Sequence, residues 1–158
     1  MESFVLRDQL EDLYARYVGA LDDGELELWP ELFTEQCLYL ILPRDNHERG
    51  LPLAVMRCES RDMLKDRVTA IRETMMYEQR YLRHHVTNIR VRAAVADTLE
   101  VSANFSIIEV LPDDLPRVAM VGRYLDKLAV GAGGEWLFTE KLCIYDSLLV
   151  ANSIIYPV

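Results

Sequence analysis

The stretch NIRVRAAVADTLEVSANFSI, residues 88–107, decides the fold class because apolar and polar residues alternate along most of it. A period of two places successive side chains on opposite faces of a strand, so the stretch predicts two strands, each with one buried and one wet face. The tetrapeptide ADTL at 96–99 predicts a turn between them. So short a connection favours antiparallel pairing.

Two further strands follow along the chain. PDDLP at 112–116 and GAGG at 131–134 are turn sequences, because proline presets φ and glycine tolerates positive φ. They predict strands near 117–130 and 135–147. Four long strands joined by short connections favour an antiparallel meander.

The first half of the chain has the spacing of helices. Apolar residues recur at helical intervals over a predicted helix from about 3 to 22, namely Leu6, Leu10, Leu13, Tyr14, Tyr17, Val18 and Leu21. LELWPELF at 26–33 predicts a short second helix, and Ser60 is a candidate N-cap for a third helix from about 61 to 76. CLYLIL at 37–42 and LAVMRC at 53–58 predict short strands, separated by a polar loop, PRDNHERG, at 43–50.

Helices that precede a meander are typical of the α+β class. We expect N-terminal helices packed in the concave face of a long, curved, mixed but mostly antiparallel sheet, which leaves a cone with a central cavity. The chain of 158 residues is long enough to bury a core of its own. We therefore expect a single domain spanning 1–158.

Charge and cysteine usage narrow the function classes. A net charge of −9 repels phosphate backbones and anionic lipid surfaces, which argues against nucleic acid or a membrane as a partner. No apolar run approaches the roughly 20 residues of a membrane span, and no secretory leader is visible. Cys37, Cys58 and Cys143 lie far apart, which is typical of neither a disulfide framework nor a zinc site. We expect reduced thiols in a cytoplasmic protein.

The histidines have two interpretations. His84 and His85 are adjacent in RYLRHH, so on a strand they point to opposite faces and cannot chelate one metal ion together. His47 lies in the predicted loop. Packing or hydrogen bonding explains these residues, and a catalytic base with a tuned pKa is the alternative.

Asp126 and Asp146 are the candidates for an acid–base pair, because they lie on neighbouring predicted strands. Asp126 shares a predicted face with Tyr124. Lys141 is expected on the opposite face from both carboxylates. Cross-strand ion pairing and interface contact are the alternative role for these charges.

No familiar catalytic or cofactor motif is present in the sequence. A GxSxG nucleophile elbow, a GxGxxG or Walker phosphate loop and an iron–sulfur cysteine set are all missing. The sequence therefore predicts no catalytic, cofactor-binding or metal-binding residue in this chain.

Two segments are candidates for contact with a partner. Tyr77, Arg80 and Tyr81 precede the first long strand, where arginine and aromatic residues favour an interface, although a segment that seals the core is the alternative. The apolar end, NSIIYPV at 152–158, is expected to dock either on its own sheet or under a partner.

Several stretches in order resemble one family across nearly the whole chain. They are LWPELFTEQCLYLIL at 28–42, DNHERGLPLAVMRCESRDMLKDRVTAIRE at 45–73, YEQRYLRHHVTNIRV at 77–91, GRYLDKL at 122–128 and EKLCIYDS at 140–147. The set resembles the small (beta) subunit of Rieske-type aromatic-ring-hydroxylating dioxygenases, above all those that act on aromatic carboxylates.

The resemblance implies the cone fold shared with nuclear transport factor and scytalone dehydratase, and a hetero-hexamer of three large and three small subunits. It also implies that the large (alpha) subunit carries the Rieske [2Fe–2S] cluster and the mononuclear Fe(II), supplied with electrons by a reductase or ferredoxin. This chain would then be a structural subunit of the oxygenase without an active site of its own.

On this reading we expect seven residues at subunit interfaces, namely Tyr81, Arg83, Arg123, Tyr124, Asp126, Lys127 and Tyr156. Two alternatives stay open. One is a stand-alone cone-fold isomerase, dehydratase or cyclase that uses cavity residues such as His85 and Asp126. The other is a module of the same fold that binds a small ligand or dimerises.

Overall fold

The computed structural model describes residues 2–74, 76–149 and 154–158. Its first helix, α1 (Glu2–Asp22), is followed by two 3-10 turns, η1 (Leu26–Leu28) and η2 (Pro30–Leu32). After β1 (Phe33–Pro43) come α2 (Arg44–Glu48), β2 (Met56–Cys58), α3 (Arg61–Thr69) and the π-helical turn η3 (Ala70–Thr74). Four long strands complete the chain, β3 (Tyr81–Val95), β4 (Thr98–Val110), β5 (Arg117–Val130) and β6 (Trp136–Tyr145).

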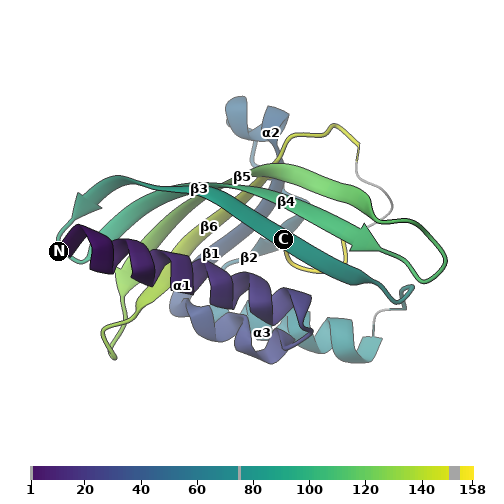
Figure 1. The fold of residues 1–158 in the computed structure, drawn as a ribbon, viewed down its shortest axis with the longest axis horizontal. Helices are drawn as coiled ribbons and strands as arrows, with labels where there is room; N and C mark the ends of the chain where they lie inside the picture. Colours follow the sequence, from purple (N-terminus) through teal and green to yellow (C-terminus); the bar gives the residue numbers. More distant parts are fainter. Residues whose placement is uncertain (1, 75, 150–153) are drawn as a thin grey trace.

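One curved sheet holds all of these strands in the order β2-β1-β6-β5-β4-β3. The β3 to β6 meander is antiparallel, whereas β1 pairs parallel to β6. Helices α1 and α3 lie on one side of the sheet, and the short α2 lies on the other (Figure 1). The α+β class and the mixed, mostly antiparallel sheet with helices on its concave face are confirmed.

The core lies between the helices and the concave face. Helix α1 buries one stripe of side chains with the expected spacing, namely Leu10, Leu13, Tyr14, Tyr17, Ala20 and Leu21. Gly24 adopts φ +74 just after the helix, a conformation that glycine takes without strain. The predicted cap of α3 is confirmed, because the Ser60 side chain accepts a hydrogen bond from the Met63 backbone N–H at 3.2 Å.

Several element boundaries differ from the sequence prediction. Residues 44–48 form α2 rather than a loop, supported by ion pairs one helical turn apart, Arg44 with Glu48 and Asp45 with Arg49. The second strand covers only 56–58 of the expected 53–58. The third α-helix ends at Thr69 and continues as η3 to Thr74, while residue 75 lies outside the described residues.

Strand β3 departs from the prediction in two ways. It begins at Tyr81, several residues earlier than the alternation indicates. Its last six residues, 90–95, are exposed on both faces instead of having one buried face. The reason is its position: β3 is the edge strand of the sheet, and an open groove separates α1 from its residues up to Val91.

Candidate functional site

A buried ion pair lies at the centre of the concave face. Asp126 of β5 and Lys141 of β6 are directly paired in register, and Lys141 Nζ lies 3.0 Å from Asp126 Oδ2. Neither side chain is exposed to solvent. The expectation that Lys141 faces away from Asp126 is wrong: the register shift between Lys127 and Leu128 places Lys141 directly opposite Asp126, and residues paired in this way share one face of the sheet.

Aromatic rings enclose the lysine. Its Nζ lies 3.6 Å from the ring centroid of Tyr124, 4.3 Å from Tyr17, 4.5 Å from Phe138 and 4.9 Å from Tyr14. A desolvated ammonium group is attracted to the negative face of such rings, so the rings offset part of the cost of burying the charge.

The carboxylate has a second partner within the helix layer. The Tyr14 hydroxyl donates a hydrogen bond to Asp126 Oδ2, which joins α1 to the ion pair. Burial raises the pKa of Asp126, and the charge of Lys141 together with the Tyr14 hydrogen bond opposes that rise. Burial also raises the pKa of Tyr14 well above its usual value, helped by the negative charge of Asp126. Tyr14, Asp126 and Lys141 are each at most 3 % exposed, so the cluster is almost fully enclosed by the fold.

Asp146 does not join Asp126. It follows the end of β6 and lies 3.5 Å from Arg44 Nη1, where both side chains are about half exposed. The predicted acid–base pair of the two carboxylates is therefore wrong: one is buried on the concave face and the other is at the surface near α2.

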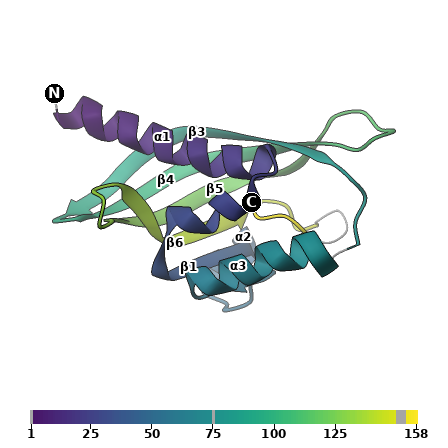
Figure 2. The same cartoon turned by 90° about the horizontal axis from the view of Figure 1, so that it is seen from below.

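The end of the chain fills the middle of the cone. The Val158 oxygen accepts hydrogen bonds from the Tyr17 hydroxyl at 2.6 Å and the Tyr39 hydroxyl at 3.2 Å, and the Cys143 thiol lies 3.1 Å away. The Val158 backbone N–H donates to the Tyr39 oxygen at 2.8 Å. Figure 2 shows the chain end beside the end of α1, with the strands of the sheet behind it. The tail was expected either on its own sheet or under a partner, and residues 154–158 pack against the sheet of their own chain.

Three polar contacts lie beside this tail. Arg80 Nη1 donates to the buried carboxylate of Glu109 at 2.7 Å, and Glu109 also accepts from Arg117 at 2.7 Å. The Tyr156 hydroxyl donates to Tyr77 at 2.7 Å. The space that remains between the tail and the sheet is about 70 Å³, less than a single aromatic ring with its substituents requires. These contacts favour the core-sealing role for Tyr77 and Arg80.

The two adjacent histidines point to opposite faces, as the strand geometry predicts. His84 is buried, and its Nδ1 lies 2.5 Å from Asp22 Oδ1 while its backbone N–H donates to Asp22 Oδ2 at 2.9 Å. His85 is exposed on the other face. The alternative active site that joins His85 to Asp126 is therefore wrong, because the two side chains lie on opposite sides of the sheet.

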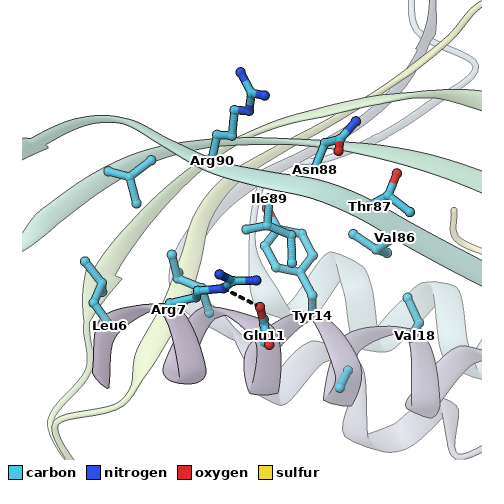
Figure 3. Close-up of a pocket in the computed structure, with 13 residues that line it drawn as sticks. Leu6, Arg7, Glu11, Tyr14, Val18, Val86, Thr87, Asn88, Ile89 and Arg90 are labelled. Atoms are coloured by element: carbon cyan, nitrogen blue, oxygen red, sulfur yellow. Dashed lines mark hydrogen bonds and ion pairs between the residues drawn. The ribbon is translucent and has the colours of Figure 1, made fainter. Parts of the chain in front are cut away.

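A groove of about 870 Å³ runs between α1 and the edge strand β3 (Figure 3). Its wall residues are Leu6, Arg7, Leu10, Glu11, Tyr14, Ala15 and Val18 from α1 and 86–91 from β3. Ile89 points toward the helix, whereas Asn88 and Arg90 point away from it (Figure 3). Arg7 and Glu11 form an ion pair at 2.8 Å beside the apolar wall. The groove can accept an apolar surface, and it presents no described pair of unengaged acid and base.

Five of the predicted interface residues reach the surface of this chain. Tyr81 is 63 % exposed, and Arg83 is paired loosely with Asp23 at 3.5 Å. Lys127 is exposed and lies 3.2 Å from Glu140, while Arg123 and Tyr156 are half-buried. These five remain candidates for subunit contact.

The other two predicted interface residues are enclosed by the chain itself. Tyr124 is fully buried and Asp126 is 3 % exposed, since both point into the concave core. Their assignment to an interface is a wrong prediction, because a partner cannot touch side chains that α1 and the sheet already cover.

Cysteine and metal chemistry find little support in the described part of the chain. Cys37, Cys58 and Cys143 are free and buried, as expected, and burial raises the pKa of Cys143 to about 12. Among the described residues, no three His, Cys, Asp or Glu side chains lie close enough to hold a metal ion. No helix among them is both long and apolar enough to cross a membrane.

The sequence does not predict the two partners of Asp126. Tyr14 lies far from Asp126 along the chain, and the alternation predicts Lys141 on the opposite face. One feature of the sequence could have indicated that Lys141 is the partner of Asp126. Lys141 interrupts the otherwise apolar inner positions Phe138, Cys143 and Tyr145, and a single buried charge needs an opposite charge nearby.

Comparison with known proteins gives a consistent result. The family model described as "Ring hydroxylating beta subunit" matches residues 16–151. The small subunit of anthranilate 1,2-dioxygenase from Burkholderia cepacia is 32 % identical over 146 residues, which cover 92 % of this chain and 90 % of that protein. Subunit beta 2 of the terminal oxygenase component of terephthalate 1,2-dioxygenase from Comamonas sp is 29 % identical over 149 residues, covering 94 % and 96 %.

A solved structure shows the same similarity in three dimensions. A crystal structure from Novosphingobium aromaticivorans, assigned as the beta subunit of an aromatic-ring-hydroxylating dioxygenase, superposes with a TM-score of 0.88 at 32 % identity. The alignment covers 99 % of this chain and 98 % of that one.

Proposed function

Since this chain belongs to the family of ring-hydroxylating dioxygenase beta subunits, we propose that it is a structural subunit of a terminal oxygenase that oxidises aromatic carboxylates. The substrate class follows the relatives, whose printed names include anthranilate and terephthalate dioxygenases. In this proposal the chain forms a single domain over 1–158 and acts in the cytoplasm.

The observation that supports a structural role is the filled cone. Enzymes of this architecture need an open cavity with reactive groups aimed into it. Here residues 154–158 occupy that space, held by Tyr17 and Tyr39. Asp126, the carboxylate nearest the centre, is engaged by Lys141 and Tyr14. Asp126 Oδ2, Lys141 and Tyr14 are thus committed to one another, while Asp126 Oδ1 and the Tyr124 hydroxyl are buried without a described hydrogen-bond partner.

The iron centres are assigned to the large subunit in this proposal. The Rieske cluster and the mononuclear Fe(II) would lie in that chain, with electrons from a reductase or ferredoxin. Two features of this chain support the assignment: His84 is already engaged by Asp22, and His85 points to the opposite face. We further propose a complex of three large and three small subunits, in which Tyr81, Arg83, Arg123, Lys127 and Tyr156 contribute contacts.

Co-purification tests the proposal. The chain is co-expressed with a large-subunit reading frame that contains the CxH…CxxH spacing of a Rieske protein, and the complex is isolated through a tag on the large subunit. We expect equal amounts of the two chains, with iron only in the large subunit after separation. We also expect oxidation of an aromatic carboxylate by the complex and no turnover by this chain alone. Iron in this chain, or turnover without the large subunit, would contradict the proposal.

A further inference from the structure

Three arginines converge on the outer face of the sheet. Arg90 and Arg92 of β3 and Arg123 of β5 surround a hollow of about 330 Å³, here called the arginine hollow. The other side chains that line it include Asn88, Ser102, Asn104 and Leu125. Arg90 and Asn88 point away from α1, toward this outer face (Figure 3).

None of the three arginines forms a hydrogen bond or ion pair with a described residue, although the charge of Arg123 helps Arg44 to lower the pKa of Glu48. The other arginines each donate a hydrogen bond to a carboxylate or a carbonyl oxygen. Arg90, Arg92 and Arg123 donate none to any described side chain or carbonyl, and the Nε of Arg123 is buried without an acceptor. Arg90 and Arg92 are exposed and carry no ion pair with a described residue, so their two positive charges favour an anionic group from outside the chain.

The same chain carries a matching acidic projection. The turn at 112–116 joins β4 to β5 and projects from one end of the sheet (Figure 2). Asp113 and Asp114 are exposed there, and neither forms an ion pair within the described part of the chain. Leu115 beside them is 80 % exposed. Two carboxylates and an apolar side chain thus stand together at an exposed tip, here called the acidic turn.

We propose that the acidic turn of one copy of this chain binds the arginine hollow of a second copy. Carboxylates pair with guanidinium groups in a planar, two-bonded geometry, and Leu115 would pack on Leu125, a half-buried residue that lines the hollow. Charge complementarity favours this occupant. Most surfaces of a chain with net charge −9 repel a second copy, whereas the positive hollow attracts the negative turn.

The geometry of such a contact has a consequence for assembly. The turn and the hollow are different surfaces of the chain, so the contact is head-to-tail and continues from copy to copy until a ring closes. This inference deepens the proposed function and rests on it for the presence of several copies in one complex.

Charge reversal tests the contact. R90E/R92E reverses the hollow and D113K/D114K reverses the turn, and a fourth protein combines all four substitutions. Self-association is measured by light scattering and sedimentation, for the chain alone and for the complex with the large subunit. We expect each reversal to weaken self-association at least tenfold and the combined protein to recover to within about threefold of wild type, because the charges are again complementary.

Matched controls separate this contact from an effect of net charge. R16E/R57E changes the net charge as the hollow variant does, and D8K/E73K changes it as the turn variant does. All four control positions are exposed and lie away from both surfaces, so self-association should stay at the wild-type level. R90Q/R92Q and D113N/D114N provide milder variants, in which we expect a smaller loss in the same direction with the fold unchanged by circular dichroism.

Each other outcome overturns the inference. A wild-type protein with one copy per particle, alone and in the complex, does so directly. Unchanged self-association in both reversals does so, as does a combined protein no better than the weaker single reversal. Loss with the hollow variant alone would mean that another acidic surface, such as one of the large subunit, occupies the hollow. Failure of the wild-type chain to co-purify with the large subunit would reject the proposed function, while the self-association of the isolated chain still decides this inference.

Discussion

At the scale of single residues, the Asp126–Lys141 pair links two strands of the sheet to the first helix. The pair connects β5 with β6, and the Tyr14 hydroxyl connects it to α1. Removing one partner leaves an uncompensated charge in the core, which costs more free energy than the loss of the attraction itself.

The first prediction concerns this pair. Asp126→Asn and Lys141→Met should each lower the free energy of unfolding by about 3–5 kcal/mol, because each leaves the other charge buried and alone. The double variant should lose much less than the sum of the two. Urea unfolding followed by circular dichroism measures all three values.

The neighbouring pair on the same two strands is the matched control. Lys127 and Glu140 lie 3.2 Å apart, but Lys127 is 53 % exposed. Lys127→Met and Glu140→Gln should each change the free energy of unfolding by about 1 kcal/mol or less, because solvent screens exposed pairs. Equal losses at the two pairs would show that burial does not set the strength of the central one.

Contacts between individual side chains are also what the sequence predicts least well. The sequence singles out Asp126, and the face that it is predicted to share with Tyr124 is confirmed, but the same alternation predicts Lys141 on the opposite face. A single register shift in β5–β6 reverses the direction of every later side chain. Such a shift depends on how the two strands pair, and the alternation within one strand does not contain that information.

At the scale of elements, one glycine lets β5 and β6 approach closely. A Cβ atom at Gly122 would lie 2.0 Å from the Ile144 carbonyl oxygen, which belongs to the neighbouring strand. Because that oxygen is backbone, the contact cannot be relieved by a change of rotamer.

The second prediction follows from this contact. Gly122→Ala should lower the free energy of unfolding by about 3 kcal/mol or more, since overpacking of a rigid site forces the backbone to shift. Thermal or urea unfolding measures the loss. Gly19→Ala is the control: no atom lies within 4 Å of a Cβ there, and alanine should stabilise α1 by about 0.5–1 kcal/mol. A stable Gly122→Ala protein would show that the strands can separate at this point.

Element prediction succeeded where the signal was local. The meander, α1 and the Ser60 cap follow from periodicity and capping chemistry within one segment. The short helix α2 was missed because its composition is that of a loop, and ion pairs one turn apart stabilise it only after the helix has formed. The exposed end of β3 was missed because its alternation is the same whether or not a helix covers it.

At the scale of the whole molecule, the tail at 154–158 completes the core. Ile155 and Val158 are buried, and Arg67 donates to the Ile154 and Ile155 carbonyls at 3.1 and 2.8 Å. The tail is therefore part of the core, although it is distant in sequence from α1 and β1.

The third prediction is that removal of 154–158 opens the cone. The shortened protein should lose about 3–5 kcal/mol of unfolding free energy, from the buried apolar area of the tail and its hydrogen bonds. It should also bind an apolar fluorescent dye that the full chain excludes. Leu149→Ser, at a side chain 86 % exposed, is the control and should change stability by less than about 0.5 kcal/mol. A shortened chain with full stability would mean that the tail only rests on the fold.

The fourth prediction concerns alkaline pH. Burial raises the pKa of Cys143 from 9.0 to about 12 and holds those of Tyr17, Tyr39 and Tyr124 well above 10. The unfolded chain releases these protons first. Stability is therefore fully present below about pH 9; it falls above pH 9 through Cys143 and above pH 10 through the tyrosines as well, by up to about 1.4 kcal/mol per pH unit for each group. Urea midpoints across this range, with tyrosinate absorbance, measure the fall, and a flat profile would contradict it.

The enclosure of Lys141 makes it a natural reporter of opening. The chain contains three lysines, and the amines of Lys65 and Lys127 are reachable by an acylating reagent in the native state, whereas that of Lys141 is sealed behind four rings. Acylation of Lys141 thus requires that β6 part from α1. Its rate, read by mass spectrometry against the other two lysines, gives the fraction of molecules that transiently open, without denaturant and inside an intact assembly.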